Sequence, residues 1–279
     1  MTYRLVTDSS ANLLALEGVE FACVPMKINT ATREYIDDAQ LDVAAMVDDI
    51  RATKGKSGTA CPNIGEWLDA FEGADRIFAV TITSNLSGSH AACVQAAREY
   101  ETEHPGAKVC VIDSLSAGPE MALILEKLRA WIGEGRGYDQ MVADITAYKQ
   151  HTHLSFCLES LTNLARNGRV SPAVAKIAGV LGIRVVGVAS EVGTLEPLHK
   201  IRGEKKAVIA LYNDMTDRGY RGGKVRIANC FNPAAAQLLE DLIHTDYPNA
   251  PIHHEPCTAL CSFYAERGGL MVGYEDSDT

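Results

Sequence analysis

The stretch RIFAVTITSNLSGSHAACVQAAREYETE, residues 76–103, joins an apolar strand to a helix through a turn rich in small hydroxyl residues. Residues 76–82 are an apolar run typical of a strand with both faces covered, and a helical pattern follows. In the turn, Ser87, Gly88 and Ser89 bring hydroxyl and backbone N–H donors to a helix N-terminus, where the helix dipole favours negative charge. We expect the turn to bind a carboxylate or a phosphate. The simpler alternative, that Ser87 only caps the helix, stays open.

The first half of the chain continues this alternation of strands and helices. We expect strands at 3–7, 21–28, 76–82 and 108–113, and helices at 11–16, 42–53, 64–71, 88–103, 117–133 and 138–150. Apolar strands alternating with amphipathic helices predict a parallel sheet covered on both faces. Ligands of such sheets bind beyond the carboxyl ends of the strands. The hydroxyl-rich strand ends should therefore share one edge: 7–10, 83–89 and 113–116.

The pattern changes after about residue 152. Strands are expected at 153–158, 183–188, 194–201, 224–230, 251–256 and 269–274, with helices at 161–165, 173–180, 203–218, 233–247 and 258–266. Strand pairs joined by helices predict an α+β lobe. The fold class is therefore α/β with two lobes: a mostly parallel, helix-flanked N-terminal domain (1–152) and a C-terminal α+β domain (153–279). Because no low-complexity linker separates them, the lobes should pack together.

The composition of the chain limits the classes of partner that it could bind. A chain of 279 residues can bury a large core and still leave a cleft between two lobes. The formal net charge of −10, without a long basic run, argues against nucleic acid. The most apolar stretch (174–189) contains Lys176 and Arg184, so we expect no membrane span. Eight cysteines without a CxxC pair suit reduced thiols, and the N-terminus lacks a signal-peptide pattern, so we expect a cytoplasmic protein.

A second loop, GKSGTACP at 55–62, resembles the end of a phosphate-binding P-loop. The motif requires a glycine at position 50 and a preceding strand, and neither is present. Ser57 and Thr59 still offer hydroxyls, and Gly58 offers an accessible N–H. The loop is either a second anion contact or a plain turn between helices.

Signs of catalysis and of metal binding are weak. Cys61 lacks a nucleophile elbow and a partner histidine in a recognisable motif. Asp8 and Asp113 are suited to proton transfer, but aspartates at strand ends commonly organise turns. His253 and His254 are adjacent and should point to opposite faces of a strand, without zinc-finger spacing. We predict no catalytic residue, no metal and no cofactor.

Five segments together resemble motifs of the DegV family, in the family's order and across almost the whole chain. They are VTDSSANL (6–13), SNLSGS (84–89), VCVIDS (109–114), LTNLARNGRVS (161–171) and KIRGEKKA (200–207). The resemblance implies a two-domain α/β fold that buries a long-chain fatty acid between or within its lobes. It also implies similarity to the fatty-acid-binding subunits of bacterial fatty acid kinase.

The resemblance also implies site residues. The carboxylate would be held by Ser57, which stands where the family has threonine, and by Ser87, with Gly58, Gly88, Ser89 and Tyr264 nearby. Tyr264 occupies the position of a family histidine, so it can donate a hydrogen bond but cannot carry positive charge. Glu266, close by, adds a negative charge.

Two arginines match positions associated with docking of the kinase subunit: Arg169 and Arg202. From the residues alone, basic positions like these either steer an acidic partner or form a solvated face.

The expected function is that of a carrier. It binds a long-chain fatty acid with the carboxylate near the surface and presents it to a separate kinase subunit that supplies ATP. The chain itself has no ATP-binding motif and is not expected to be an enzyme. Two alternatives stay open: an enzyme acting on a small phosphorylated or carboxylated metabolite through Asp8 and Asp113, and an interaction module without a ligand.

Overall fold

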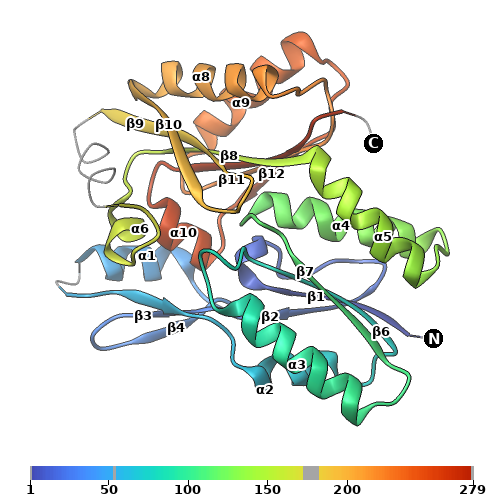
Figure 1. Ribbon diagram of the computed structural model, residues 1–279. Coiled ribbons are helices and arrows are strands. Elements are labelled where there is room, and N and C mark those ends of the chain that lie inside the picture. Colours follow the sequence, from blue (N-terminus) through green and yellow to red (C-terminus); the bar gives the residue numbers. More distant parts are fainter. Residues whose placement is uncertain (1, 53–54, 172–181, 278–279) are drawn as a thin grey trace.

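The computed structural model describes residues 2–52, 55–171 and 182–277, which form three β-sheets (Figure 1). The first is a four-stranded parallel sheet in the order β2 (Glu20–Val24), β1 (Tyr3–Asp8), β6 (Arg76–Thr81) and β7 (Lys108–Asp113). Its faces are covered by α2 (Ile64–Phe71) and α3 (Ser89–Glu103) on one side and by α4 (Pro119–Gly133) and α5 (Tyr138–Tyr148) on the other. This is the predicted parallel sheet with two covered faces.

The second sheet has six strands, from β10 (Leu195–Arg202) through β9 (Ile183–Ala189), β8 (Thr152–Leu158), β13 (Leu270–Glu275) and β11 (Val225–Asn229) to β12 (Ile252–Pro256). Only β11 and β12 run parallel. Helices α8 (Glu204–Asp217) and α9 (Pro233–Asp246) pack on its outer face. Its inner face meets α4, α6 (Thr162–Arg166) and α10 (Ala259–Ala265).

These two sheets confirm the predicted fold class. The strands of the parallel sheet all precede residue 114, and the six-stranded sheet begins at Thr152. Helix α4 contacts strands of both sheets, so the lobes are packed through it. The division into domains 1–152 and 153–279 stays a prediction.

A small third sheet was not predicted. It joins β4 (Glu34–Ile36), β3 (Lys27–Asn29) and β5 (Gly58–Ala60) and packs near α1 (Val43–Ala52). The strand predicted at 21–28 is wrong as one element, because Pro25 separates β2 from β3 and brings no N–H donor to a ladder.

The helix predicted at 11–16 is a single 3-10 turn, η1 (Ser9–Ala11). It ends at Asn12, whose φ of 57° is left-handed, and polar side chains satisfy the backbone there in place of further helix. A second such turn, η2 (Lys149–His151), follows α5. The helix predicted at 173–180 lies outside the described residues.

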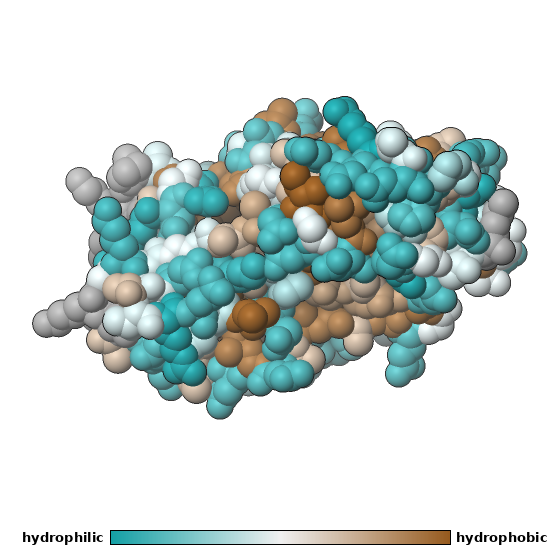
Figure 2. Space-filling model, turned by 90° about the horizontal axis from the view of Figure 1, so that it is seen from below, coloured by the Kyte–Doolittle hydropathy of each residue, from teal (hydrophilic) through white to brown (hydrophobic). Residues whose placement is uncertain are grey.

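Seen from below, hydrophobic residues form separate patches among hydrophilic ones (Figure 2). The exposed large hydrophobic side chains of the described part are Ile36, Val192 and Phe231. Within the same ranges of the chain, every helix is too short or too polar to cross a lipid bilayer.

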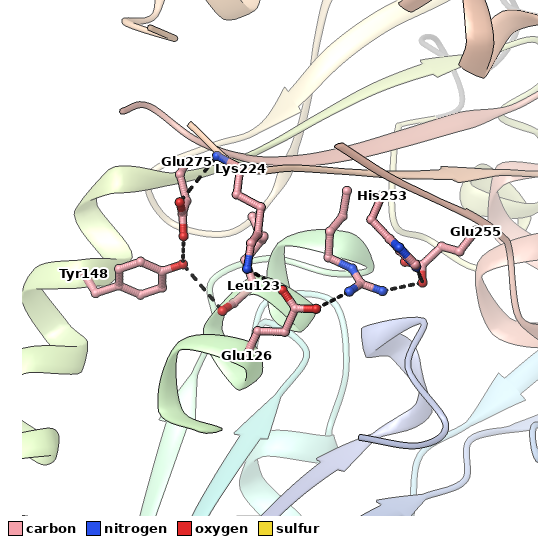
Figure 3. Close-up of polar contacts among 8 residues, drawn as sticks. Leu123, Glu126, Tyr148, Lys224, His253, Glu255 and Glu275 are labelled. Atoms are coloured by element: carbon pink, nitrogen blue, oxygen red, sulfur yellow. Dashed lines mark hydrogen bonds and ion pairs between the residues drawn. The ribbon is translucent and has the colours of Figure 1, made fainter. Parts of the chain in front are cut away.

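A network of polar side chains ties α4 and α5 to the six-stranded sheet (Figure 3). Glu126 of α4 pairs with Arg226 of β11, and Arg226 pairs in turn with Glu255 of β12. Tyr148, at the end of α5, donates its hydroxyl proton to Glu275 of β13 over 2.5 Å. Charged and hydrogen-bonded groups therefore fix the relative placement of the two large sheets.

Glu120, in the first turn of α4, is a buried carboxyl that accepts a hydrogen bond from Thr152 Oγ1 at 2.9 Å. Burial raises the pKa of Glu120 from 4.5 to about 7, against the opposing effect of the hydrogen bonds that it accepts. Because the folded-state pKa exceeds that of the unfolded chain, the stability gained from the neutral carboxyl is complete below pH 4.5 and is lost as pH rises through 7.

We therefore expect the unaltered protein to lose on the order of 3 kcal/mol of folding free energy between acidic and mildly alkaline pH because of Glu120. Glu120→Gln should not show this loss, because its amide does not titrate. Urea unfolding of both proteins at about pH 5 and pH 8 measures the difference. Glu99→Gln, on the exposed face of α3, is the control. A decline in Glu120→Gln as steep as in the unaltered protein would contradict the prediction.

Candidate functional site

Asp8 organises the carboxyl edge of the parallel sheet. It is fully buried at the end of β1 and accepts hydrogen bonds from the N–H and hydroxyl of Ser10. Its second oxygen accepts the N–H of Ile82 at 3.1 Å and the hydroxyl of Ser89 at 2.6 Å. Burial raises the pKa of Asp8, and these hydrogen bonds oppose the rise. Asp8 thus joins two strand ends to the start of α3, as a residue that supports turns does.

Asp113 has a similar place at the end of β7. Its carboxylate accepts the N–H groups of Ser84 (3.3 Å) and Leu115 (3.0 Å). Both aspartates that could have served as acid and base are therefore engaged with the turns beside them. No cluster of histidine, cysteine and acidic residues in the described part of the chain is arranged to hold a metal ion.

The turn before α3 opens on a cavity. Ser87 and Gly88 line it, whereas the hydroxyl of Ser89 faces Asp8. The Ser87 hydroxyl oxygen accepts the N–H of Ser89 at 3.2 Å, but the N-cap of α3 is Gly88 and has no side-chain capping bond; the Ser87 proton is left to donate elsewhere. A Cβ atom on Gly88 would lie 3.5 Å from Cys61 Sγ, so this turn meets the loop after β5.

The cavity has a volume of about 310 Å³, within the range of ligand pockets, and lies between the carboxyl edge of the parallel sheet and the inner face of the six-stranded sheet. Leu154, Phe156 and Leu158 line it at alternate positions of β8 and span about 13 Å. The rest of the lining is mostly apolar: Met26, Ala60, Cys61, Ile82, Leu86, Ala117, Leu164, Leu195, Leu260, Cys261, Ala265 and Met271.

Polar side chains gather where the two loops meet. Thr59 Oγ1 and Tyr264 Oη are 2.7 Å apart, so one of their two hydroxyl protons is shared and the other is left to donate. Arg169 also lines the cavity, and its Nε donates to the carbonyl of Leu86 at 3.1 Å, next to Ser87. The arrangement offers donors and one cation at the end of an apolar channel, which suits an amphipathic anion.

Ser57 and Gly58 precede Thr59 in the chain and do not line the apolar cavity. Ser57 lines a neighbouring hollow of about 800 Å³, and its carbonyl accepts a hydrogen bond from Asn167 Nδ2 at 3.3 Å. A Cβ atom on Gly58 would lie 3.1 Å from Asn167 Oδ1. In β5, Thr59 is the residue whose hydroxyl reaches the cavity.

The two remaining charged positions lie apart from the apolar lining. Arg202 is exposed at the end of β10 and lines neither hollow. Glu266 lines the larger hollow, where its carboxylate accepts the N–H of Asn163 at 3.0 Å. Its negative charge is thus turned toward the N-terminus of α6, which favours it.

Sequence patterns missed one residue that positions this site, Asp37, and named a second, Thr59, without assigning it to the site. Asp37, buried after β4, accepts the N–H groups of Ala259 (2.8 Å) and Leu260 (3.0 Å) and so fixes the start of α10. Thr59 is a hydroxyl residue next to a glycine, as Ser57 is. Only the pairing of β5 with β3 shows that Thr59, and not Ser57, faces the cavity.

A family model described as "Uncharacterised protein, DegV family" matches residues 2–276. The chain belongs to the DegV family. This confirms the family that the five motifs indicated. A DegV domain-containing protein of Streptococcus pneumoniae is 44% identical over 279 residues, which cover 99% of each chain.

Solved structures of DegV proteins agree with the fold described above. A DegV family protein from Eubacterium eligens, loaded with heptadecanoic acid, is 46% identical with a TM-score of 0.96, and the match covers 98% of this chain and 99% of that one. The fatty acid kinase (Fak) B3 protein of S. pneumoniae, loaded with linoleic acid, is 43% identical with a TM-score of 0.97, over 99% and 100%.

Proposed function

We propose that this DegV protein binds one long-chain fatty acid, with the hydrocarbon tail in the apolar cavity along β8 and the carboxylate at the polar end. The observation that carries the proposal is the apolar cavity that ends among Ser87, Thr59 and Tyr264. Support comes from the two relatives of matching fold that are loaded with heptadecanoic and linoleic acid.

Burial of the tail dominates the expected affinity. A sixteen-carbon acid has about fourteen methylenes, each worth about 0.8 kcal/mol on leaving water, so the tail contributes on the order of 11 kcal/mol before association costs. The polar end fixes which end of the ligand faces outward. The lining has no motif for a particular chain length or degree of saturation, because selectivity of this kind depends on shape.

The carboxylate binds to donors from separate elements. The Ser87 hydroxyl and the N–H of Gly88 donate from the start of α3, and the free proton of the Thr59–Tyr264 pair donates from the other side. Arg169 supplies the positive charge that Tyr264 lacks. The Ser57 carbonyl holds the start of β5 in place through Asn167, Gly58 leaves room for the Asn167 side chain, and the Ser89 N–H orients the Ser87 oxygen.

The protein is proposed to act as a carrier and not as an enzyme. Gly88 is exposed, so a carboxylate beside it is within reach of a second protein. A separate kinase subunit would transfer phosphate from ATP to this carboxylate, giving an acyl phosphate, and Arg169 and Arg202 would contribute to its docking. The eight cysteines are all free, which fits residence in the reducing cytoplasm.

Mass spectrometry of the freshly purified, denatured protein tests the proposal. We expect one long-chain acid per chain. An empty protein that also fails to take up added palmitate would overturn the proposal. Turnover of a small phosphorylated or carboxylated metabolite by such an empty protein would favour the enzyme alternative.

Replacing Ser87 by alanine removes a hydrogen bond to a charged group. We expect Ser87→Ala to weaken palmitate binding by about 1 to 3 kcal/mol, measured by titration of delipidated protein. Ser84→Ala is the matched control, because Ser84 is exposed in the same turn and lines neither hollow. Equal affinities of Ser87→Ala and Ser84→Ala would remove Ser87 from the site.

A further inference from the structure

Glu266 has a backbone conformation that side chains avoid. It follows the last residue of α10 with φ 52° and ψ 169°, a region that is essentially restricted to glycine. A glutamate held in this conformation indicates that its surroundings, or its side-chain contacts, compensate for the strain.

The carboxylate of Glu266 makes such a contact. It accepts the N–H of Asn163, near the start of α6, at 3.0 Å. The Asn163 side chain returns the contact, because its Nδ2 donates to the carbonyl of Phe263 in α10 at 2.8 Å. Two hydrogen bonds therefore join the end of α10 to the start of α6.

Both helices lead from this junction to the polar end of the cavity. Asn167, just after α6, donates from its Nδ2 to the carbonyls of Asn163 (2.9 Å) and Ser57 (3.3 Å). Arg169 follows and donates to the Leu86 carbonyl. Tyr264, two residues before Glu266, meets Thr59. The two loops that form the polar end are thus bonded to α10 or to the residues that directly follow α6.

We propose that Glu266 is a positioning residue for the fatty-acid site: its carboxylate fixes α6 against α10 and so holds Arg169 and Tyr264 where the acid binds. The inference rests on the proposed function. Glu266 does not contact the ligand, because it lines the larger hollow and not the apolar cavity.

Three substitutions separate positioning from general stability. Glu266→Gln keeps an oxygen that accepts the Asn163 N–H. Glu266→Gly relieves the backbone strain but removes that oxygen, and Glu266→Ala removes the oxygen while keeping the strain. Each protein is delipidated and loaded with the fluorescent polyene cis-parinaric acid, and the release rate and the thermal midpoint of the unloaded protein are measured.

We expect Glu266→Gly to release the probe at least tenfold faster while its thermal midpoint stays equal or rises. Glu266→Gln should release within about twofold of the unaltered protein, and Glu266→Ala should lose both thermal stability and retention. A purely structural role would instead move stability and release together.

Two results would overturn the inference while leaving the proposed function intact: a release rate of Glu266→Gly equal to that of the unaltered protein, or a release from Glu266→Gln as fast as from Glu266→Gly. An unaltered protein that neither carries nor takes up any long-chain acid would overturn the proposed function, and the inference with it.

Discussion

Replacing Ala117 by phenylalanine will empty the cavity of long-chain acid and leave the protein folded. Ala117 is a small residue of the lining, next to the start of α4. Its new ring has open space to enter, so the substitution fills a void and does not displace packed atoms. The part of the fatty-acid tail that lies beyond the new ring would no longer fit in the cavity. At about 0.8 kcal/mol per methylene, five or six methylenes amount to on the order of 4 to 5 kcal/mol, or a roughly thousandfold loss of affinity.

The measurement combines three readings on Ala117→Phe: the acid that co-purifies, a palmitate titration and the thermal midpoint. Ala130→Phe is the matched control, because Ala130 lies in α4, the helix that follows Ala117, and is exposed. The control should keep its acid. Co-purification of a stoichiometric long-chain acid with Ala117→Phe would show that the tail lies elsewhere.

The parallel sheet could be predicted because its signals are local. Three of its four strands, β1, β6 and β7, are apolar runs followed by small polar residues, and the strand ends at Asp8, Thr81 and Asp113 carry the same chemistry. In a parallel sheet such ends share one edge regardless of strand order. The hydrogen bonds that Asp8 accepts from Ile82 and Ser89 follow from that arrangement.

The small sheet could not be predicted in the same way. Strands β3, β4 and β5 have three residues each, too few to show a period, and β5 pairs with β3 some thirty positions earlier in the chain. This pairing decides that Thr59, and not Ser57, reaches the cavity. The geometry of Glu266 also depends on a tertiary contact, because its partner Asn163 lies 103 residues away.

The buried ion pairs of Arg226 should contribute strongly to the folding free energy. The Arg226 side chain is 5% exposed, and its partners Glu126 and Glu255 come from α4 and β12. Arg226→Ala would remove the buried cation that both carboxylates share, leaving Glu255 without its arginine and Glu126 with only the half-exposed Lys224. The desolvation of unpaired charge then costs about 3 to 5 kcal/mol of folding free energy. Urea unfolding should show this loss, and the effect should depend weakly on salt because buried pairs are poorly screened.

Two comparisons make this prediction specific to charge. Lys224→Ala removes a half-exposed partner of Glu126, 3.2 Å away, and should cost less than about 1 kcal/mol. The triple variant Arg226→Met, Glu126→Leu, Glu255→Leu replaces the whole cluster by apolar side chains of similar size. It should recover most of the stability lost in Arg226→Ala, because no charge remains buried without a partner. A triple variant as unstable as Arg226→Ala would mean that lost packing, and not unpaired charge, causes the effect.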